Sequence, residues 1–333
     1  MKNQVRAIAA LCLGAAMLLG TCVTGNAAAS KDKPIVMKFG HVMSTDNSWH
    51  KGCMKFAEIV REKTGGRIKV QVFPNSQLGD ERDMAEGCQM GTIDMVIIGG
   101  IMGNFYEPIQ LFEIPYFFKD INHVRKVIYV PLGEEIKADI YKQSGLVSLE
   151  FWERCPRVLS SNKPVLSVED VKGLKLRTPE IPATVAAWKA IGANPTPMPW
   201  AEVYTALQQK TIDAQENPLA TIASAKVEEV QSHIALTNHV FGTPQHIMSG
   251  GTWERLSAED KAVIKEAAKE AREYQNAIAW EEDAATKEVF VKKGVIFTEP
   301  DLSGFQERSQ SIHGEFAARY GKELYDKVQK AAE

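Results

Sequence analysis

Apolar and polar positions along the chain predict strands and helices that follow one another from residue 35 onward. Residues 35–39 form a short apolar run, which is typical of a strand. Apolar residues then recur at helical spacing, at Trp49, Cys53, Phe56 and Val60. Residues 68–72 alternate between apolar and polar, which predicts a second strand. A strand, a helix and a strand in this order predict a βαβ unit and hence a largely parallel sheet.

The same order of elements is expected twice. A predicted helix at 80–90 leads through Thr-Ile-Asp at 92–94 into a buried strand, and a predicted helix at 201–209 leads through Thr-Ile-Asp at 211–213 into another. We therefore expect an α/β protein with two lobes of similar build, mixed, mostly parallel sheets and a ligand cleft between the lobes. The expected first lobe comprises residues 30–154 and 243–282, and the second comprises residues 155–242 and 283–333.

The longest uninterrupted helical pattern lies between residues 257 and 292. Ser257 and Asp260 form a capping signature at its start, and no Gly or Pro follows until Gly294. At 1.5 Å per residue such a helix would reach about 50 Å, which is more than the width of one lobe. We expect one helix that spans both lobes; the alternative is two helices with a bend near Trp280.

Residues 1–29 have the pattern of a signal peptide. Lys2 and Arg6 supply the positive start, residues 8–20 the apolar stretch, and alanines 27–29 the cleavage site. The apolar stretch is too short to span a bilayer, which takes about 20 residues. A lipoprotein anchor on Cys22 is the alternative, but the preceding threonine is bulkier than such sites usually carry. We expect cleavage to a soluble periplasmic protein.

Charge and cysteine usage narrow the class of partner. Loss of the two basic residues in the signal peptide leaves 37 basic residues against 42 acidic ones, a net charge near −5. This balance argues against nucleic acid or an anionic membrane surface as partner. Cys53, Cys88 and Cys155 lack the close spacing of a zinc or redox motif, so we expect buried thiols rather than a disulfide.

Motifs of the common enzyme classes are absent from the sequence. It contains no Gly-x-Ser-x-Gly elbow, no His-Glu-x-x-His, no phosphate loop and no dinucleotide fingerprint. The seven histidines show no metal-ligand spacing. We expect no enzyme activity, no metal and no cofactor. A hydrolase or lyase is the alternative, and it would need Cys155 or His239 as its nucleophile or base.

Arginine and amide side chains follow three predicted strands. They are Arg154 and Arg157 after residues 149–152, Arg177 after residues 173–176, and Asn217 after residues 211–214. Ligands of open α/β sheets gather at such strand ends. An arginine there can hold a carboxylate through two parallel hydrogen bonds, which a lysine cannot do. The sequence therefore predicts a site for a small organic anion.

Four segments together resemble a known family. They are VQVFPNSQLGDE at 70–81, GLKLRTPE at 173–180, PTPMPWAEVYTALQ at 195–208 and DAQENPLA at 213–220. In this order and spacing they resemble the solute-binding proteins of tripartite ATP-independent periplasmic (TRAP) transporters, called the DctP family. The resemblance runs from about residue 37 to the C-terminus.

The resemblance implies roles for particular residues. Arg177 matches the family arginine that forms a salt bridge to the ligand carboxylate, and Asn217 matches an asparagine that helps to hold it. Arg157 matches a second family arginine, Trp200 an aromatic residue that lines the pocket, and Glu81 a polar contact from the first lobe. The resemblance also implies the two-lobed periplasmic binding protein fold, which has the long lobe-spanning helix expected above.

Five further residues are expected at the site or directly behind it. We expect His41, Gln77 and Met102 to approach the ligand from the first lobe when the lobes close. His239 is expected behind the binding residues. Arg154 is also expected there, in an ion pair with one of two nearby glutamates, Glu153 or Glu150.

Departures from the sialic-acid-binding branch of the family suggest the character of the ligand. Val42, Gly99 and Met102 stand where that branch carries polar contacts, so sialate is an unexpected ligand. Gly99 and Gly100 would leave room opposite the flat indole of Trp200. We therefore expect a ligand that combines one carboxylate with a partly apolar remainder.

These observations predict a monomeric solute-binding protein. It would capture a small organic acid anion by lobe closure, with bending of the long helix. It would then deliver the anion to the small and large membrane subunits of an ion-gradient-driven TRAP transporter. A sensor subunit that hands its ligand to a receptor kinase is the alternative.

Overall fold

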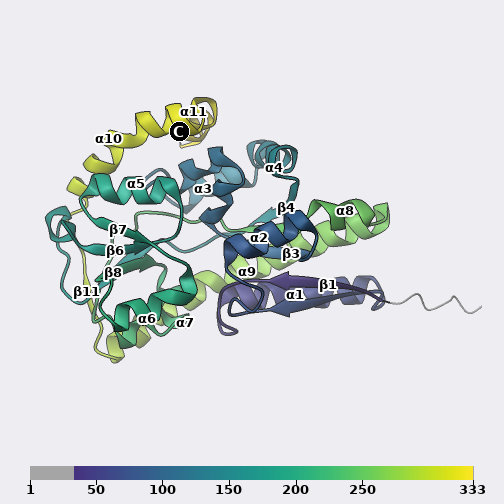
Figure 1. The fold of residues 1–333 in the computed structure, drawn as a ribbon, viewed down its shortest axis with the longest axis horizontal. Coiled ribbons are helices and arrows are strands. Elements are labelled where there is room, and N and C mark those ends of the chain that lie inside the picture. The colour runs from purple at the N-terminus through teal and green to yellow at the C-terminus, as the bar shows by residue number, and fades with distance from the viewer. Residues whose placement is uncertain (1–33, 333) are drawn as a thin grey trace, which may run out of the picture. The chain divides into compact units, whose positions relative to one another are not determined.

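The computed structural model describes residues 34–332, so the predicted signal peptide lies outside the described residues. Residues 34–332 contain one sheet of five strands and one of six (Figure 1). The five-stranded sheet has the order β2 (Ile68–Phe73), β1 (Ile35–Gly40), β3 (Met95–Ile98), β10 (Gln245–Ser249) and β4 (Leu146–Phe151). The six-stranded sheet has the order β11 (Ile296–Thr298), β9 (His233–Ala235), β5 (Val158–Ser161), β8 (Ala214–Asn217), β6 (Lys175–Thr178) and β7 (Asn194–Pro197).

Both sheets are mixed, and together they contain five parallel and four antiparallel strand pairs. β1 pairs in parallel with β2 and β3, as the predicted βαβ pattern requires, and β6 pairs in parallel with β7 and β8. β10 is antiparallel to both β3 and β4, and β5 is antiparallel to both β8 and β9. The prediction of a two-lobed α/β fold with mixed, mostly parallel sheets is confirmed.

Helices accompany both sheets (Figure 1). Between β1 and β4 in the chain come α1 (Ser48–Lys63), α2 (Glu81–Met90), α3 (Ile121–Ile128) and α4 (Pro131–Ser144), with short 3-10 turns at Gly100–Asn104 and Glu107–Glu113. Between β6 and β9 come α5 (Pro182–Ile191), α6 (Val203–Gln208) and α7 (Leu219–Ser224). The later helices are α8 (Gly250–Arg255), α9 (Ala258–Lys292), α10 (Ser303–Tyr320) and α11 (Lys322–Ala331).

The apolar core is divided between the two sheets. A large cluster packs around the five-stranded sheet, and two smaller clusters pack on the six-stranded one. Val158 and Leu159 of β5 belong to different small clusters, because successive strand residues point to opposite faces. Cys53, Cys88 and Cys155 are buried free thiols, as expected.

α9 is a single helix of 35 residues, so the alternative of two separate helices is wrong. The Ser257 side chain caps its start by accepting a hydrogen bond from the Asp260 backbone. α9 packs against α1, beside the five-stranded sheet, and against α7, which follows a strand of the six-stranded sheet. It therefore contacts both halves of the fold, as predicted.

Two chain segments cross between the sheets side by side. One joins β4 to β5 and contains Arg154 and Arg157, and the other joins β9 to β10. They are tied by an isolated bridge between Pro156 and Phe241 and by a hydrogen bond of 2.9 Å from the Arg157 amide to the Val240 carbonyl. This pairing fixes both arginines between the two sheets.

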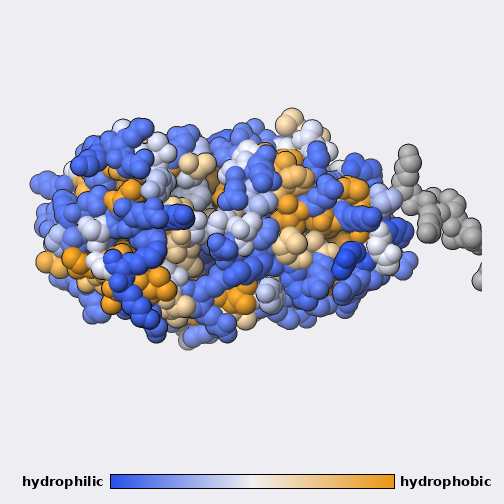
Figure 2. All heavy atoms as spheres, turned by 90° about the horizontal axis from the view of Figure 1, so that it is seen from below, coloured by the Kyte–Doolittle hydropathy of each residue, from blue (hydrophilic) through white to orange (hydrophobic). Residues whose placement is uncertain are grey.

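The outer surface is mostly polar. In Figure 2, hydrophilic residues cover most of the face shown, and apolar ones gather in smaller patches. Within residues 34–332 there is no helix with both the length and the apolar character needed to cross a bilayer.

Candidate functional site

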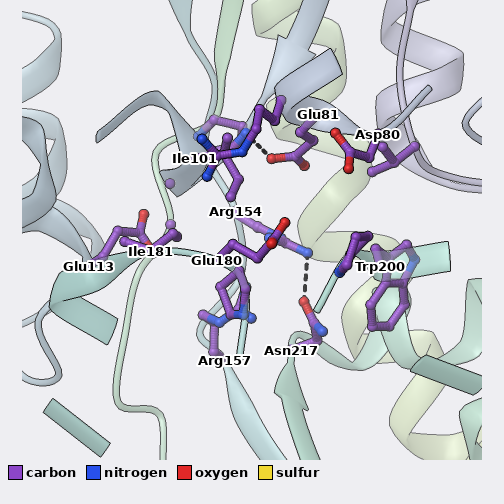
Figure 3. Close-up of a pocket in the computed structure, with 18 of the residues that line it drawn as sticks. Asp80, Glu81, Ile101, Glu113, Arg154, Arg157, Glu180, Ile181, Trp200 and Asn217 are labelled. Atoms are coloured by element: carbon purple, nitrogen blue, oxygen red, sulfur yellow. Dashed lines mark hydrogen bonds between the residues drawn. The ribbon is translucent and has the colours of Figure 1, made fainter. Parts of the chain in front are cut away.

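A cavity lies where the loops of the five-stranded sheet face the strands of the six-stranded sheet. It holds about 740 Å³ of space free of atoms, including its open mouth. Its charged and amide lining consists of Asp80, Glu81, Arg82, Glu113, Arg154, Arg157, Arg177, Glu180 and Asn217. Apolar residues, glycines and prolines complete the lining, among them Val42, Gly99, Gly100 and Trp200. Figure 3 shows Glu81 and Asn217 on opposite sides of Arg154.

Two of the site residues lie within strands of the six-stranded sheet. Arg177 lies inside β6 and Asn217 ends β8, whereas the sequence predicted that each follows its strand. The difference arises because Gly173 turns the chain with a φ of 71°, so β6 begins at Lys175 rather than at 173. Residues inside neighbouring strands are held by the ladder hydrogen bonds, which makes their side chains well anchored.

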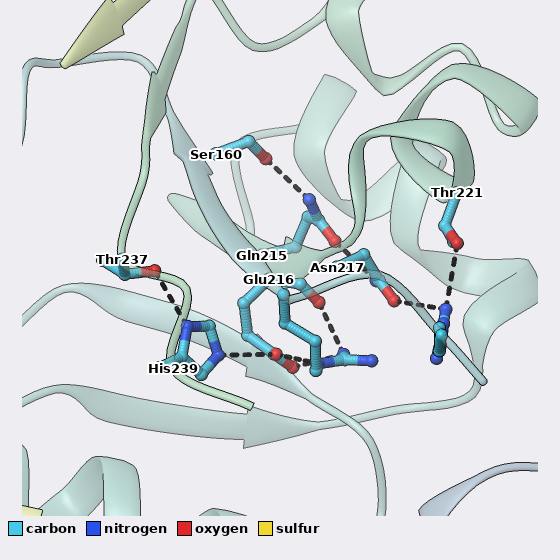
Figure 4. A network of polar contacts seen from close by, with 9 residues as sticks. Ser160, Gln215, Glu216, Asn217, Thr221, Thr237 and His239 are labelled. Carbon is cyan, nitrogen blue, oxygen red and sulfur yellow. Dashed lines mark hydrogen bonds and ion pairs between the residues drawn. The ribbon is translucent and has the colours of Figure 1, made fainter. Parts of the chain in front are cut away.

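Arg157 is paired within the protein. Its Nη2 donates at 2.6 Å to Glu216 Oε1, and its Nε donates to Glu216 Oε2. His239 Nε2 lies 3.0 Å from Glu216 Oε2 (Figure 4). Burial alone would raise the pKa of Glu216, but the Arg157 guanidinium lowers it to about 2. The Arg157 charge is therefore balanced by a buried carboxylate before any ligand arrives.

Arg177 is held differently. Its Nε and Nη2 both donate to the Met198 carbonyl oxygen, at 3.0 and 2.7 Å, and its guanidinium carbon lies 5.6 Å from the centre of the Trp200 ring. No carboxylate among residues 34–332 forms an ion pair with it. Burial lowers the pKa of Arg177 to about 10, so it remains charged at neutral pH. Its positive charge is available to an anion in the cavity.

Arg154 lines the cavity rather than lying behind it. Its Nη2 donates to Asn217 Oδ1 at 2.9 Å and to Thr221 Oγ1 at 3.0 Å, and its guanidinium carbon lies 5.3 Å from the Trp49 ring centre. Burial and the nearby Arg157 charge lower its pKa to about 9. Like Arg177, it remains charged at neutral pH.

The expected ion pair of Arg154 with Glu153 or Glu150 is wrong. Glu153 accepts hydrogen bonds from Arg125 at 2.8 and 2.7 Å, and Glu150 accepts one from Arg272 at 3.0 Å. Successive residues of an extended segment point in opposite directions, so Glu153 faces away from the cavity that Arg154 enters.

The Asn217 amide is engaged at both ends within the protein. Its oxygen accepts from Arg154, and its nitrogen donates at 2.7 Å to Gln215 Oε1. Gln215 Nε2 donates in turn to Ser160 Oγ at 2.8 Å (Figure 4). Asn217 thus joins Arg154 to a buried polar chain in the six-stranded sheet.

Two carboxyl groups occupy the space beside Gly99 and Gly100. Glu81 Oε2 accepts a hydrogen bond of 3.1 Å from the Gly99 amide, and it would lie 3.6 Å from a Cβ placed on Gly99. A Cβ on Gly100 would fall 2.5 Å from Glu113 Oε1. The expected open and weakly polar wall at these glycines is therefore wrong, because a carboxyl group lies beside each of them and the one beside Gly100 occupies the place of its missing side chain.

Three of the expected site residues do not line the cavity. The buried His41 contacts His50 through its Nε2 at 3.1 Å, and Met102 lies in the core of the five-stranded half. Gln77 is exposed in the loop before α2. His239 lies behind Arg157, to which it is linked through Glu216, and this is the supporting position that was expected for it.

The sequence analysis missed four charged residues of the cavity lining, Asp80, Arg82, Glu113 and Glu180, and Glu113 is the most deeply buried of them. It lies in the segment Gln-Leu-Phe-Glu-Ile-Pro at 110–115, where its neighbours are buried apolar side chains. A single carboxylate within such an apolar segment was the available signal. A buried charge needs a partner or a function, since burial of an isolated carboxylate is costly.

Known proteins are similar to this chain in sequence and in fold. The family described as bacterial extracellular solute-binding protein, family 7 (DctP), matches residues 39–319. A C4-dicarboxylate-binding periplasmic protein of Rhodobacter capsulatus is 31% identical over 307 residues, which cover 90% of this chain and 91% of that protein. A TRAP periplasmic solute-binding protein of Roseobacter denitrificans OCh 114 with bound L-galactonate has a TM-score of 0.85 and 36% identity, covering 90% of this chain and 99% of that one. A Polaromonas protein of the same kind, bound to D-erythronate, has a TM-score of 0.85 and 34% identity, covering 89% and 98%.

Proposed function

Because this chain belongs to the DctP family of bacterial extracellular solute-binding proteins, we propose that it captures a small organic acid anion in the cavity between its two sheets and delivers it to the membrane subunits of a TRAP transporter. The observation that carries this proposal is Arg177. Its buried guanidinium lines the cavity and has only a carbonyl oxygen as its partner within residues 34–332. A ligand carboxylate would supply the missing negative charge.

Capture proceeds by closure of the two halves around the anion. The arginine-bearing six-stranded half holds the carboxylate, and the loops of the five-stranded half cover it with Glu81 and Gly99. Closure excludes water and so strengthens the charge contacts, because the effective dielectric constant falls. The segments at 152–157 and 239–244, which cross between the sheets, carry the change in backbone angles.

Export and transport complete the proposal. Residues 1–29 direct the chain to the periplasm and are removed there, and the small and large membrane subunits receive the ligand from the closed form. The names of the relatives support this compartment, since they include periplasmic binding proteins. The two bound sugar acids named above, L-galactonate and D-erythronate, support a hydroxylated acid as the ligand.

A thermal-shift screen of the mature protein tests the proposal. The panel contains aldonates, uronates, hydroxy acids, keto acids, aromatic acids and dicarboxylates, with sialic acid as an expected non-binder. At least one acid should raise the melting temperature, and calorimetry should give a one-to-one stoichiometry. Small-angle scattering with that acid at saturation should show a smaller radius of gyration. Stabilisation by no organic acid at all would contradict the proposed function.

A further inference from the structure

We propose that Glu81 and Glu113 make this site selective for hydroxylated monocarboxylates and exclude acids that carry a second carboxylate. This inference rests on the proposed function, because it assigns the part of the ligand that lies away from the arginines. It concerns two carboxyl groups that line the same cavity as Arg154 and Arg177.

Of the two carboxyl groups, Glu113 gives the stronger evidence. Its side chain is 7% exposed, it lines the cavity, and it forms no hydrogen bond or ion pair with any of residues 34–332. Gly100 leaves the space that it occupies, since a Cβ there would fall 2.5 Å from Glu113 Oε1. Because Glu113 lines the cavity and has no protein partner, its carboxyl oxygens are free to accept hydrogen bonds from a ligand there.

Glu81 offers a second acceptor on another side of the cavity (Figure 3). One of its oxygens accepts from the Gly99 amide at 3.1 Å, and the other accepts no hydrogen bond from any of the described residues. The Asp80 capping box fixes the start of α2 and so holds Glu81 in place. The cavity thus contains two anchored carboxyl groups with free acceptor oxygens.

Charge in the cavity is unevenly distributed. The Arg157 charge is balanced by Glu216, whereas Arg154 and Arg177 have no carboxylate partner among residues 34–332. A ligand carboxylate can therefore pair with these two cations. Toward Glu81 and Glu113 the same ligand must present hydrogen-bond donors, and a hydroxyl group is a donor whereas a carboxylate only accepts.

A second ligand carboxylate would meet these glutamates as a like charge in a water-poor cavity. Burial already raises the pKa of Glu113 and of Glu81, although nearby arginines oppose the shift. Another negative charge nearby would raise the pKa values of both glutamates further. A dicarboxylate could then bind only together with a proton, whereas a monocarboxylate with hydroxyl groups would need none.

Matched pairs of acids test the selectivity. Galactonate and galactarate share a carbon skeleton and differ in one terminal group, a hydroxymethyl against a carboxylate, and erythronate and tartrate of matching configuration form a four-carbon pair. Calorimetry at pH 7.5 should show the monocarboxylate of at least one pair binding at least about tenfold more tightly than its dicarboxylate. Titrations in two buffers of different ionisation enthalpy should show proton uptake only for the dicarboxylate.

Two variants locate the effect. Glu113→Gln and Glu81→Gln keep the size of the side chain and remove its charge, so each should shrink the preference for the monocarboxylate by about tenfold. Glu62→Gln, at an exposed position on α1, is the matched control and should leave the preference unchanged. Melting curves of every variant report on folding. If a variant is unstable, the test rests on the wild-type protein, through the ratio of its affinities for the monocarboxylate and the dicarboxylate of each pair.

The possible outcomes separate the two proposals. Equal or tighter binding of the dicarboxylates, binding only of acids without hydroxyl groups, or a preference that survives both substitutions would overturn this inference while leaving acid capture intact. If no acid of any class binds, the proposed function itself fails.

Discussion

Arg154 donates a hydrogen bond of 2.9 Å to the Asn217 amide oxygen, and the Asn217 amide nitrogen donates in turn to Gln215. The amide that was expected to hold the ligand carboxylate is thus engaged with protein groups on both sides. Asn217 is therefore placed to act by positioning Arg154. This arrangement gives the extra arginine a fixed orientation and leaves its Nε and Nη1 hydrogens to the cavity.

A double-mutant cycle should reveal this dependence. Arg154→Gln and Asn217→Ala should each weaken binding of the best acid about tenfold, since each removes or misplaces one charge-assisted contact. In the Arg154→Gln background, Asn217→Ala should then add less than about twofold, because residues that act through one contact are not additive. Calorimetry on the four proteins measures the coupling. Fully additive losses would mean that Asn217 contacts the ligand independently.

Arg177 should account for most of the carboxylate affinity. Arg177→Ala should weaken binding about a thousandfold, since removal of one partner of a buried charge pair costs roughly 3–5 kcal/mol. Arg177→Lys should also bind poorly, because lysine lacks the planar fork. The exposed Arg61, changed to Ala, is the control. Calorimetry giving an Arg177→Ala affinity within threefold of wild type would argue that the carboxylate lies elsewhere.

Arg157 should matter more for folding than Arg177 does. Arg157→Ala leaves the buried Glu216 without its cation, so the free energy of unfolding should fall by roughly 3–5 kcal/mol. Arg177→Ala leaves no carboxylate uncompensated, and its free energy of unfolding should stay within about 1 kcal/mol of wild type. Urea unfolding followed by circular dichroism measures both. Similar losses in the two variants would refute this division between a structural and a ligand-binding arginine.

Acid should weaken the fold through Glu216. Its pKa is lowered from 4.5 to about 2 by Arg157, so its contribution is fully present above pH 4.5 and is lost as the pH falls toward 2. The full effect is about 3 kcal/mol. Urea unfolding at several pH values should therefore show the gap between wild type and Glu216→Gln narrowing by about that amount from pH 5 to pH 2. A gap that stays constant across this range would show that Glu216 titrates normally in the folded protein.

Strand-end reasoning located the arginines and the asparagine because it depends on pattern and chain order alone. Arg177, Arg157 and Asn217 all line the predicted cavity between the sheets. What the sequence could not supply was side-chain direction. Arg154 was assigned to neighbouring glutamates because they are close in sequence, yet an extended chain turns Glu153 the other way.

The cavity wall that comes from the five-stranded half was harder to predict for a related reason. Gly99 and Gly100 suggested open space, but a glycine says only that a side chain is missing, not what fills its place. Glu113 fills the place of the Gly100 side chain from a segment more than ten residues later in the sequence. Such contacts between distant segments are a product of packing, and an apolar stretch around a lone glutamate gives no indication of where it points.

The uninterrupted α9 helix constrains how the two halves can move. It has no Gly or Pro along its 35 residues, and its Asp283 accepts a hydrogen bond of 3.0 Å from the Ala220 amide in α7 while its Gln275 contacts Ser48 in α1 at 3.3 Å. Kinks in helices arise mainly at Pro, at Gly or at inserted groups, so the expected bending of this helix has no favoured place. We infer that α9 moves as one rigid helix. Because it is attached to α1 through Gln275 and to α7 through Asp283, it keeps α1 and α7 at a constant separation. The change in backbone angles on closure would then be confined to the crossing segments at 152–157 and 239–244, while α9 keeps its shape.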